Sequence, residues 1–230
     1  MPPFVPWSRF LPWFGARWEQ GDHIAAVGMT KSGKTVAMTR LLRYRDYVSV
    51  IGTKPRDREL YPPLERQGYW LTEEWNPVDL EHPRVILAPM LDVEGGSGPA
   101  FDRQADIFDS ALLTVYRVGA WCLYFDELRY LSQQLGLTDT LDLLWLQGRS
   151  LDVSIVAATQ RPRSVPLNMF EMARHFFLWR IGDREDRRRA SEFLGDMQAV
   201  ADFATARLAR HEFLYVDPID GLAYRSRVQL

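Results

Sequence analysis

The chain has 230 residues, of which 47% are hydrophobic and 25% are charged, a composition typical of a globular protein with a sizeable core. This excludes a disordered chain and a collagen-like repeat, and a single cysteine, Cys122, excludes an internal disulfide framework. A formal net charge of −2 also disfavours a protein that coats nucleic acid through general basicity. Only three of the 28 basic residues are lysines: Lys31, Lys34 and Lys54.

The N-terminal residues are rich in aromatic side chains and proline. They lack the basic region and unbroken apolar run of a signal peptide, and no apolar run in the chain approaches the ~20 residues of a membrane-spanning helix. We expect residues 1–20 to form an arm ahead of a single domain at residues 21–230. The simpler interpretation is that this arm packs on the domain's own surface; the alternative is that it docks on a neighbouring subunit, a membrane or a capsid.

From residue 21 onward, short apolar runs alternate with helical patterns. Strands are expected at 23–28, 47–52, 84–88, 121–125, 153–159 and 175–181, and helices at 34–43, 101–116, 138–149 and 183–194. The end of the chain predicts a β-hairpin, with strands at 211–216 and 222–228 joined by a turn at 217–221. Apolar strands that alternate with helices predict an α/β fold, with a mainly parallel central sheet covered by helices on both faces.

The strongest motif follows the first expected strand. It is the run Gly28-Met29-Thr30-Lys31-Ser32-Gly33-Lys34-Thr35, which fits G-x-x-x-x-G-K-[ST] between a strand and a helix. Glycines let such a loop wrap around phosphate with its N–H groups inward, and the following helix presents its positive end. We expect the loop to bind ATP, with Lys34 on the β- and γ-phosphates and the Thr35 hydroxyl on Mg²⁺. The alternative is a glycine turn before an ordinary helix.

Polar side chains follow two further expected strands. Asp126 and Glu127 come directly after residues 121–125, where a parallel sheet places its nucleotide-binding edge. We expect Asp126 to hold the Mg²⁺ shell and Glu127 to act as the general base on water, which favours hydrolysis over transfer to a small acceptor. Gln160 follows residues 153–159 and is expected to sense the γ-phosphate, or else to serve as a turn or capping residue.

Two stretches carry a family resemblance. Residues 148–162, which end in Thr159-Gln160-Arg161-Pro162, resemble the helix end, strand and A-T-Q-R-P motif of the FtsK–HerA superfamily of DNA-translocating ATPases, in the RecA-like branch of P-loop proteins. Residues 50–55 are similar to the family's second strand, which usually ends in Asp-Pro-Lys. Here Gly52 stands in place of that aspartate, so the role of its carboxylate does not carry over.

The resemblance implies roles for residues and partners. Lys34, Thr35, Asp126, Glu127 and Gln160 take the roles stated above. Family members work as rings, usually hexamers, in which an arginine of one subunit completes its neighbour's site; Arg149 is the first candidate here and Arg161 the second.

The resemblance also implies a function. The size and layout are similar to the genome-packaging ATPases of tailless, membrane-containing viruses. We therefore expect an ATP-hydrolysing translocase of double-stranded DNA, above all a viral or phage packaging motor in the host cytoplasm or associated with the virion, with capsid vertex or membrane proteins as further partners. The alternatives are a non-packaging DNA-handling ATPase of a phage or plasmid, a nucleotide or small-molecule kinase and a nucleotide-dependent assembly switch.

Two segments are candidates for contacting DNA. One is the glycine-rich stretch 95–98 together with Arg103. The other is the segment 180–189, in which acidic residues nearly balance the arginines, so that a solvated or intersubunit helix face is the favoured interpretation. The four histidines and Cys122 have no metal-ligand spacing, so we expect no structural zinc.

Overall fold

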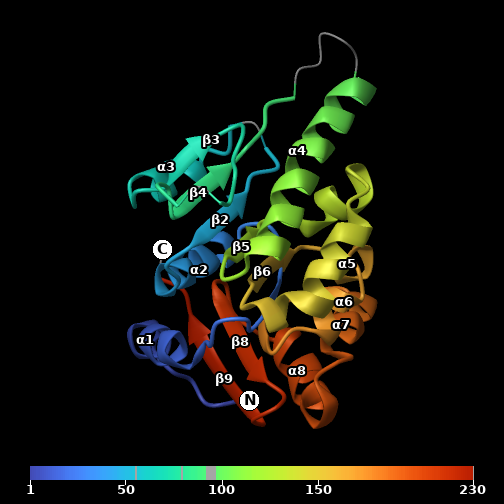
Figure 1. The fold of residues 1–230 in the computed structure, drawn as a ribbon. Coiled ribbons are helices and arrows are strands. Elements are labelled where there is room, and N and C mark those ends of the chain that lie inside the picture. The colour runs from blue at the N-terminus through green and yellow to red at the C-terminus, as the bar shows by residue number, and fades with distance from the viewer. Residues whose placement is uncertain (55, 79, 92–96, 230) are drawn as a thin grey trace.

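A computed structural model describes residues 1–229 except 55, 79 and 92–96. In this part of the chain nine strands form one sheet in the order β3-β4-β2-β5-β6-β1-β7-β8-β9 (Figure 1). The strands are β1 (Ile24–Val27), β2 (Val48–Ile51), β3 (Trp70–Thr72), β4 (Arg84–Leu87), β5 (Cys122–Phe125), β6 (Ser154–Thr159), β7 (His175–Trp179), β8 (Glu212–Asp217) and β9 (Leu222–Arg227).

All neighbouring strands from β3 to β7 are parallel, and β8 and β9 add an antiparallel hairpin at one edge. The α/β fold with a mainly parallel sheet and a C-terminal hairpin is therefore confirmed. The expected stretches at 50–55 and 95–98 include position 55 and positions 95 and 96, which lie outside the described residues.

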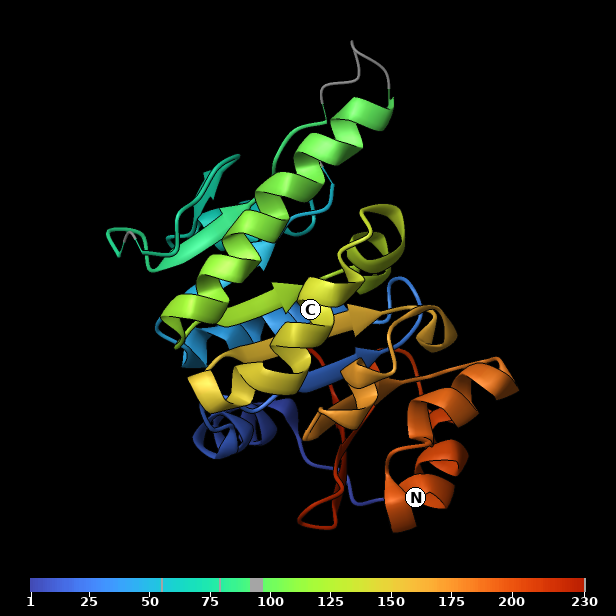
Figure 2. The same ribbon diagram turned by 45° about the vertical axis from the view of Figure 1, so that its right-hand side comes forward.

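Helices cover both faces of the sheet, because successive strand residues point to opposite sides. On one side Leu123 and Phe125 belong to a core shared with α4 (Ser97–Val118), α5 (Thr138–Gln147), α6 (Asn168–Glu171), α7 (Arg184–Ser191) and α8 (Gln198–Thr205). On the other side Cys122 and Tyr124 pack in a core with α1 (Trp7–Arg17), α2 (Lys34–Leu41) and α3 (Tyr61–Glu65). Figure 2 shows the two helical layers with the sheet between them.

Short turns extend several helices. The expected helices 34–43 and 138–149 end as the 3₁₀ turns Leu42–Tyr44 and Gly148–Leu151, and further 3₁₀ turns lie at Pro162–Ser164 and Gly195–Met197. A π-helical turn, Tyr130–Gln134, follows β5. None of the described helices is long and apolar enough to cross a membrane.

The N-terminal segment contains α1, a helix that the proline-rich sequence did not reveal. Trp7, Phe10, Leu11 and Phe14 recur at helical spacing and are all buried. The Phe10 ring centroid lies 5.2 Å from that of Phe213 on β8. The apolar side of residues 1–20 is thus buried on the hairpin end of the sheet.

The parallel strands bring the motif residues to one edge of the sheet. In the register of β1 with β6, Val27 lies opposite Thr159, and in that of β5 with β6, Phe125 lies opposite Ala157. Residues that directly follow β1, β5 and β6 therefore meet at the carboxyl edge.

Candidate active site

The phosphate loop, residues 28–35, leaves β1 and enters α2 at this edge. Gly33 has φ +98°, a left-handed conformation that side chains with a Cβ rarely adopt. At Gly28 a Cβ would lie 2.5 Å from the Cβ of Trp179. Both glycines are therefore required by the path of the backbone. The loop lines a cavity of about 570 Å³ together with Lys54, Asp126 and Gln160, among other residues.

The Lys34 side chain lies along the inside of the loop. Its ammonium donates hydrogen bonds to the carbonyl oxygens of Gly28 and, at 3.0 Å, Met29. Burial lowers the Lys34 pKa to about 8, although the nearby Asp126 and Glu127 carboxylates act in the opposite direction. The cation is therefore poised for an anionic ligand that would compensate for its lost hydration.

Asp126 is held by two hydroxyl groups from different elements. Thr35 Oγ1 donates to Asp126 Oδ1 at 2.9 Å, and the fully buried Tyr124 donates its phenolic hydrogen to the same oxygen at 2.5 Å. Hydroxyl and carboxylate oxygens are the donors that Mg²⁺ prefers, so the residues present fit this ion. Tyr124 was not singled out in the sequence, although its position two residues before Asp126 puts it on the same side of β5.

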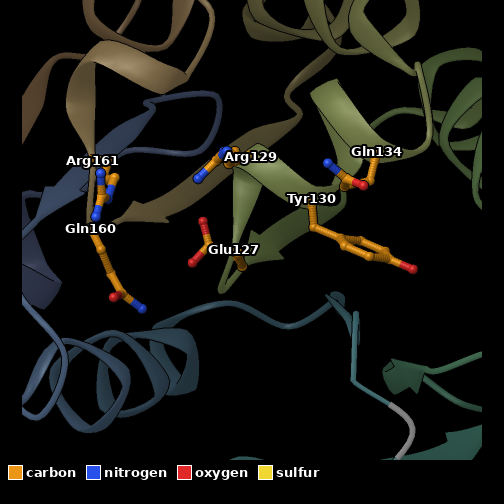
Figure 3. A pocket seen from close by; sticks show the side chains of 6 residues that line it. All are labelled: Glu127, Arg129, Tyr130, Gln134, Gln160 and Arg161. Atoms are coloured by element: carbon orange, nitrogen blue, oxygen red, sulfur yellow. The ribbon is translucent and has the colours of Figure 1, made fainter.

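The Glu127 side chain faces a second cavity of about 350 Å³. The other residues that line it are Arg129, Tyr130, Gln134, Gln160 and Arg161. Figure 3 shows the Glu127 carboxylate between the Gln160 side chain on one side and Tyr130 on the other. Burial, followed by the charge of Asp126, raises the Glu127 pKa above its ordinary value. A more basic carboxylate is better suited to take a proton from water.

Tyr130 connects this cavity to the long helix α4. Its hydroxyl donates to Gln104 Oε1 at 2.6 Å, and Gln104 Nε2 donates to the carbonyl oxygen of Pro89 at 2.8 Å. Neither Arg129 nor Tyr130 was predicted from the sequence as a site residue.

Gln160 lies against the phosphate loop. Its Oε1 accepts a hydrogen bond from Thr30 Oγ1 at 2.6 Å, so the residue after β6 contacts the loop after β1. Arg161 is exposed beside it and lines the Glu127 cavity. The structure thus brings Lys34, Thr35, Asp126, Glu127 and Gln160 together, with Arg161 at their margin.

The structure explains why position 52 is a glycine, where the family that the sequence resembles has an aspartate. A Cβ at this position would overlap with the Tyr61 hydroxyl and lie 2.9 Å from the Ala88 Cβ. The nearby cation, Lys54, instead donates to Asp57 Oδ2 at 3.0 Å, and both side chains line the large cavity. Burial lowers the Lys54 pKa, but the hydrogen bond and charge of Asp57, together with the charges of Asp126 and Glu127, outweigh it, so the pKa is raised.

Arg149 lies at the other end of the sheet. It belongs to the turn before β6, and its guanidinium is 3.7 Å from the Asp22 carboxylate, which precedes β1. Because β6 has six residues, this end is roughly 20 Å from the carboxyl edge. Within one chain Arg149 is therefore apart from the other site residues, and it could reach a nucleotide only in a neighbouring subunit.

Arg210 and His211 line the large cavity and were not predicted from the sequence as site residues. His211 has φ +63°, and its Nδ1 is 3.3 Å from the carbonyl oxygen of Ser32 in the phosphate loop. No local motif marks these residues, because only the antiparallel return of β8 brings them to the loop.

The fold and this arrangement define a class. The site combines a glycine-rich loop that holds a buried lysine, a threonine hydrogen-bonded to the aspartate that follows β5, and an adjacent glutamate. With the fold, it makes the chain a P-loop ATPase.

Comparisons with known proteins agree at the level of the fold. No family model and no curated protein matches the sequence. Among solved structures, the genome packaging NTPase B204 from Sulfolobus turreted icosahedral virus 2 in complex with sulfate aligns with a TM-score of 0.68 at 15% identity, covering 93% of this chain and 99% of that chain. VirB4 of Thermoanaerobacter pseudethanolicus aligns with a TM-score of 0.65 at 10% identity, covering 90% and 89%. The pCW3 conjugation coupling protein TcpA aligns with a TM-score of 0.53 at 15% identity, covering 89% of this chain and 59% of that one. The chain has the fold of the FtsK–HerA-type ATPases.

Proposed function

We propose that this protein is an ATP-driven translocase of double-stranded DNA that works as a ring, and that it packages a viral genome. The proposal rests on one observation above all: this chain and the packaging NTPase B204 cover each other almost end to end, at 93% and 99%. The elements of this chain thus correspond to those of a packaging NTPase over nearly all of both chains, which supports the same kind of work.

The hydrolytic step follows from the site geometry. Lys34 would neutralise the β- and γ-phosphates, and Thr35 and Asp126 would hold Mg²⁺. When bound, this ion supplies positive charge to the phosphate oxygens and so favours departure of the terminal phosphate. Glu127 accepts the proton of the attacking water, and its raised pKa suits that role. Gln160 accepts a hydrogen bond from Thr30 in the phosphate loop, and we propose that loss of the terminal phosphate alters this contact.

The positions of the arginines support the proposed ring. Arg149 is at the amino edge of the sheet, so it serves a neighbouring subunit rather than its own site, whereas Arg161 is exposed beside Gln160. An arginine supplied by a neighbour would contribute ~10³–10⁵ in rate, which makes hydrolysis depend on assembly. We propose double-stranded DNA in the ring and capsid vertex or membrane proteins as partners during packaging.

Hydrolysis of ATP with and without double-stranded DNA tests this proposal. We expect the protein to form an oligomer, which a measurement of its mass in solution detects, and we expect DNA to raise its rate of ATP hydrolysis. Glu127→Gln should lower kcat by about 10²–10⁴ while ATP still binds. Glu65→Gln, on the exposed side of α3, is the matched control and should behave as the original protein. A strictly monomeric protein whose hydrolysis ignores DNA would overturn the proposal. A Glu127→Gln variant that keeps its biological activity would instead indicate a nucleotide-dependent assembly switch.

A further inference from the structure

The cavity at the phosphate loop extends past the loop to a pair of residues with no assigned role. Arg210 and His211 directly precede β8 and line this cavity. Lys54 and Asp126, which line the same cavity, follow β2 and β5 in the chain. The cavity therefore has one wall on each side of the phosphate loop.

The strand order gives these two walls different tasks. β1 lies between β6 and β7, so the residues after β5 and β6 are on one side of the loop and the start of β8 is on the other. The terminal phosphate must face Glu127 to react. Because a triphosphate is a linear chain, its nucleoside end then points away from β5 and β6, toward β7 and β8. That is the side of Arg210 and His211.

The His211 backbone is held in a costly conformation. Its φ of +63° is unfavourable for a residue with a Cβ, and such strain persists only where surrounding contacts impose it. Two contacts do so here: Val228 N donates to the His211 carbonyl oxygen at 3.0 Å, and His211 Nδ1 lies 3.3 Å from the Ser32 carbonyl oxygen. The imidazole is thereby fixed against the phosphate loop.

The Ser32 contact also determines the chemistry of the free ring nitrogen. A carbonyl oxygen can only accept, so Nδ1 carries the hydrogen, and Nε2 of the neutral ring is an acceptor. In the part of the chain that the structure describes, Nε2 has no hydrogen-bond partner. A nucleoside offers matching donors in its ribose hydroxyls and in the amino group of adenine.

We propose that Arg210 and His211 bind the nucleoside end of the nucleotide. His211 Nε2 accepts a hydrogen bond from the ribose or from the adenine amino group, and the exposed Arg210 guanidinium stacks on the base. This inference rests on nucleotide binding at the phosphate loop, which is part of the proposed function, and it requires neither DNA translocation nor a ring.

Two ligands that share their phosphates separate this role from phosphate binding. ATP and inorganic tripolyphosphate are titrated against the protein in the presence of Mg²⁺. We expect Arg210→Ala and His211→Asn each to weaken ATP binding by about three- to tenfold and to leave tripolyphosphate binding unchanged. Asparagine is chosen at position 211 because it tolerates a positive φ. Arg207→Ala is the matched control, since Arg207 stacks on Phe203 and does not line the cavity.

The outcomes are distinct. Equal losses for both ligands would overturn the proposal, because the two residues would then act through the shape of the phosphate loop. Unchanged ATP binding in both variants would also overturn it. Lys34→Ala should abolish binding of both ligands. If the original protein binds neither ligand, nucleotide binding itself fails and the proposed function falls with it.

Discussion

Lys34 is a charged side chain almost withdrawn from solvent, with 7% of its surface exposed. Burial of a cation is unfavourable unless an anion or hydrogen bonds compensate, and its acceptors here are two loop carbonyl oxygens. The lowered pKa of about 8 expresses this cost. At the residue scale, the site is therefore arranged for its ligand at some expense to the protein without it.

The affinity for ATP should depend on pH because of Lys34. Its pKa is about 8 without ligand, so the ammonium loses its proton above that pH, whereas phosphate binding requires the charged form. ATP affinity should therefore fall as the pH rises from about 8 to about 9.5, by up to tenfold per pH unit, with proton uptake on binding. Calorimetric titration in buffers of different ionisation enthalpy measures both effects. Lys34→Arg, which stays protonated, should lose the pH dependence; a flat profile in the original protein contradicts the lowered pKa.

Tyr124 should act as a positioning residue for Asp126. Tyr124→Phe keeps the buried ring but removes one of the two hydroxyl groups that hold Asp126 Oδ1. Loss of such a support should weaken the apparent affinity for Mg²⁺ about 10- to 100-fold while the fold persists. Hydrolysis measured against Mg²⁺ concentration checks this. The control is Tyr69→Phe, another buried tyrosine whose hydroxyl contacts Arg84 away from the site. An unchanged Mg²⁺ dependence in Tyr124→Phe would rule out the positioning role.

At the scale of elements, the hairpin of β8 and β9 has two attachments. On one face, α1 packs its aromatic side chains against β7 and β8; Phe14 and Phe177, for example, have ring centroids 5.0 Å apart. At the carboxyl edge, the residues that flank the hairpin contact the phosphate loop and α2, where Arg40 donates to the carbonyl oxygen of Gln229. The N-terminal helix thus supports, through the hairpin, one wall of the nucleotide cavity.

The packing of α1 should contribute strongly to stability. Phe10 is fully buried and contacts aromatic rings of α1, β7 and β8, so Phe10→Ala should lower the free energy of unfolding by about 3–5 kcal/mol. Urea denaturation measures the change. Phe4→Ala, at a position that is 48% exposed, is the control and should cost less than about 1 kcal/mol. If Phe10→Ala lowered the free energy of unfolding as little as Phe4→Ala does, α1 would not be part of the cooperative core.

At the scale of the whole molecule, the two ends of the sheet differ in chemistry. The carboxyl edge holds the proposed nucleotide site, whereas the amino edge holds buried ionisable groups. Asp22 is 3.4 Å from His175 and 3.2 Å from Arg174, and Arg17 on α1 is 3.3 Å from Asp217 on β8. These contacts join α1, the hairpin and the central strands into one charged network. Burial lowers the pKa of His175, and although burial raises the pKa of Asp22, its hydrogen bond with His175 and the nearby positive charges lower it overall, so stability is sensitive to acid.

Stability should fall as the pH is lowered from about 6.5 to about 4. Burial lowers the pKa of His23 to about 4, and His23 Nδ1 accepts a hydrogen bond from Ile155 N at 3.2 Å. The unfolded chain therefore binds more protons than the folded one in this window, so the contribution is present above it and lost through it. We expect a loss on the order of 2–3 kcal/mol from this group.

His23→Asn isolates that contribution. Asparagine keeps an acceptor for Ile155 N but does not titrate in this range, so its unfolding free energy should change less between pH 7 and pH 4, even though its absolute stability is lower. Urea unfolding curves at several pH values measure the slope. Identical slopes in the two proteins would show that His23 is not the titrating group.

The sequence alone determined the α/β fold and the order of its central strands and helices along the chain. It could do so because strand patterns, helix patterns and the phosphate-loop spacing are local. It also predicted which residues follow β1, β5 and β6, and a parallel sheet necessarily gathers such residues at one edge. It missed α1, since proline and crowded aromatic residues obscure the helical period, and it missed the short β3 and α3, whose apolar patterns are too brief to detect.

Only the tertiary structure decided which side chains act on one another across the sheet. Tyr61 fills the space that a side chain at Gly52 would need. His211 reaches Ser32 only because β8 returns antiparallel beside β7. These contacts join residues distant in the chain or depend on a strained backbone, so no local pattern specifies them. The same principle places Arg149 at the opposite edge from the phosphate loop, and therefore beyond the reach of its own site.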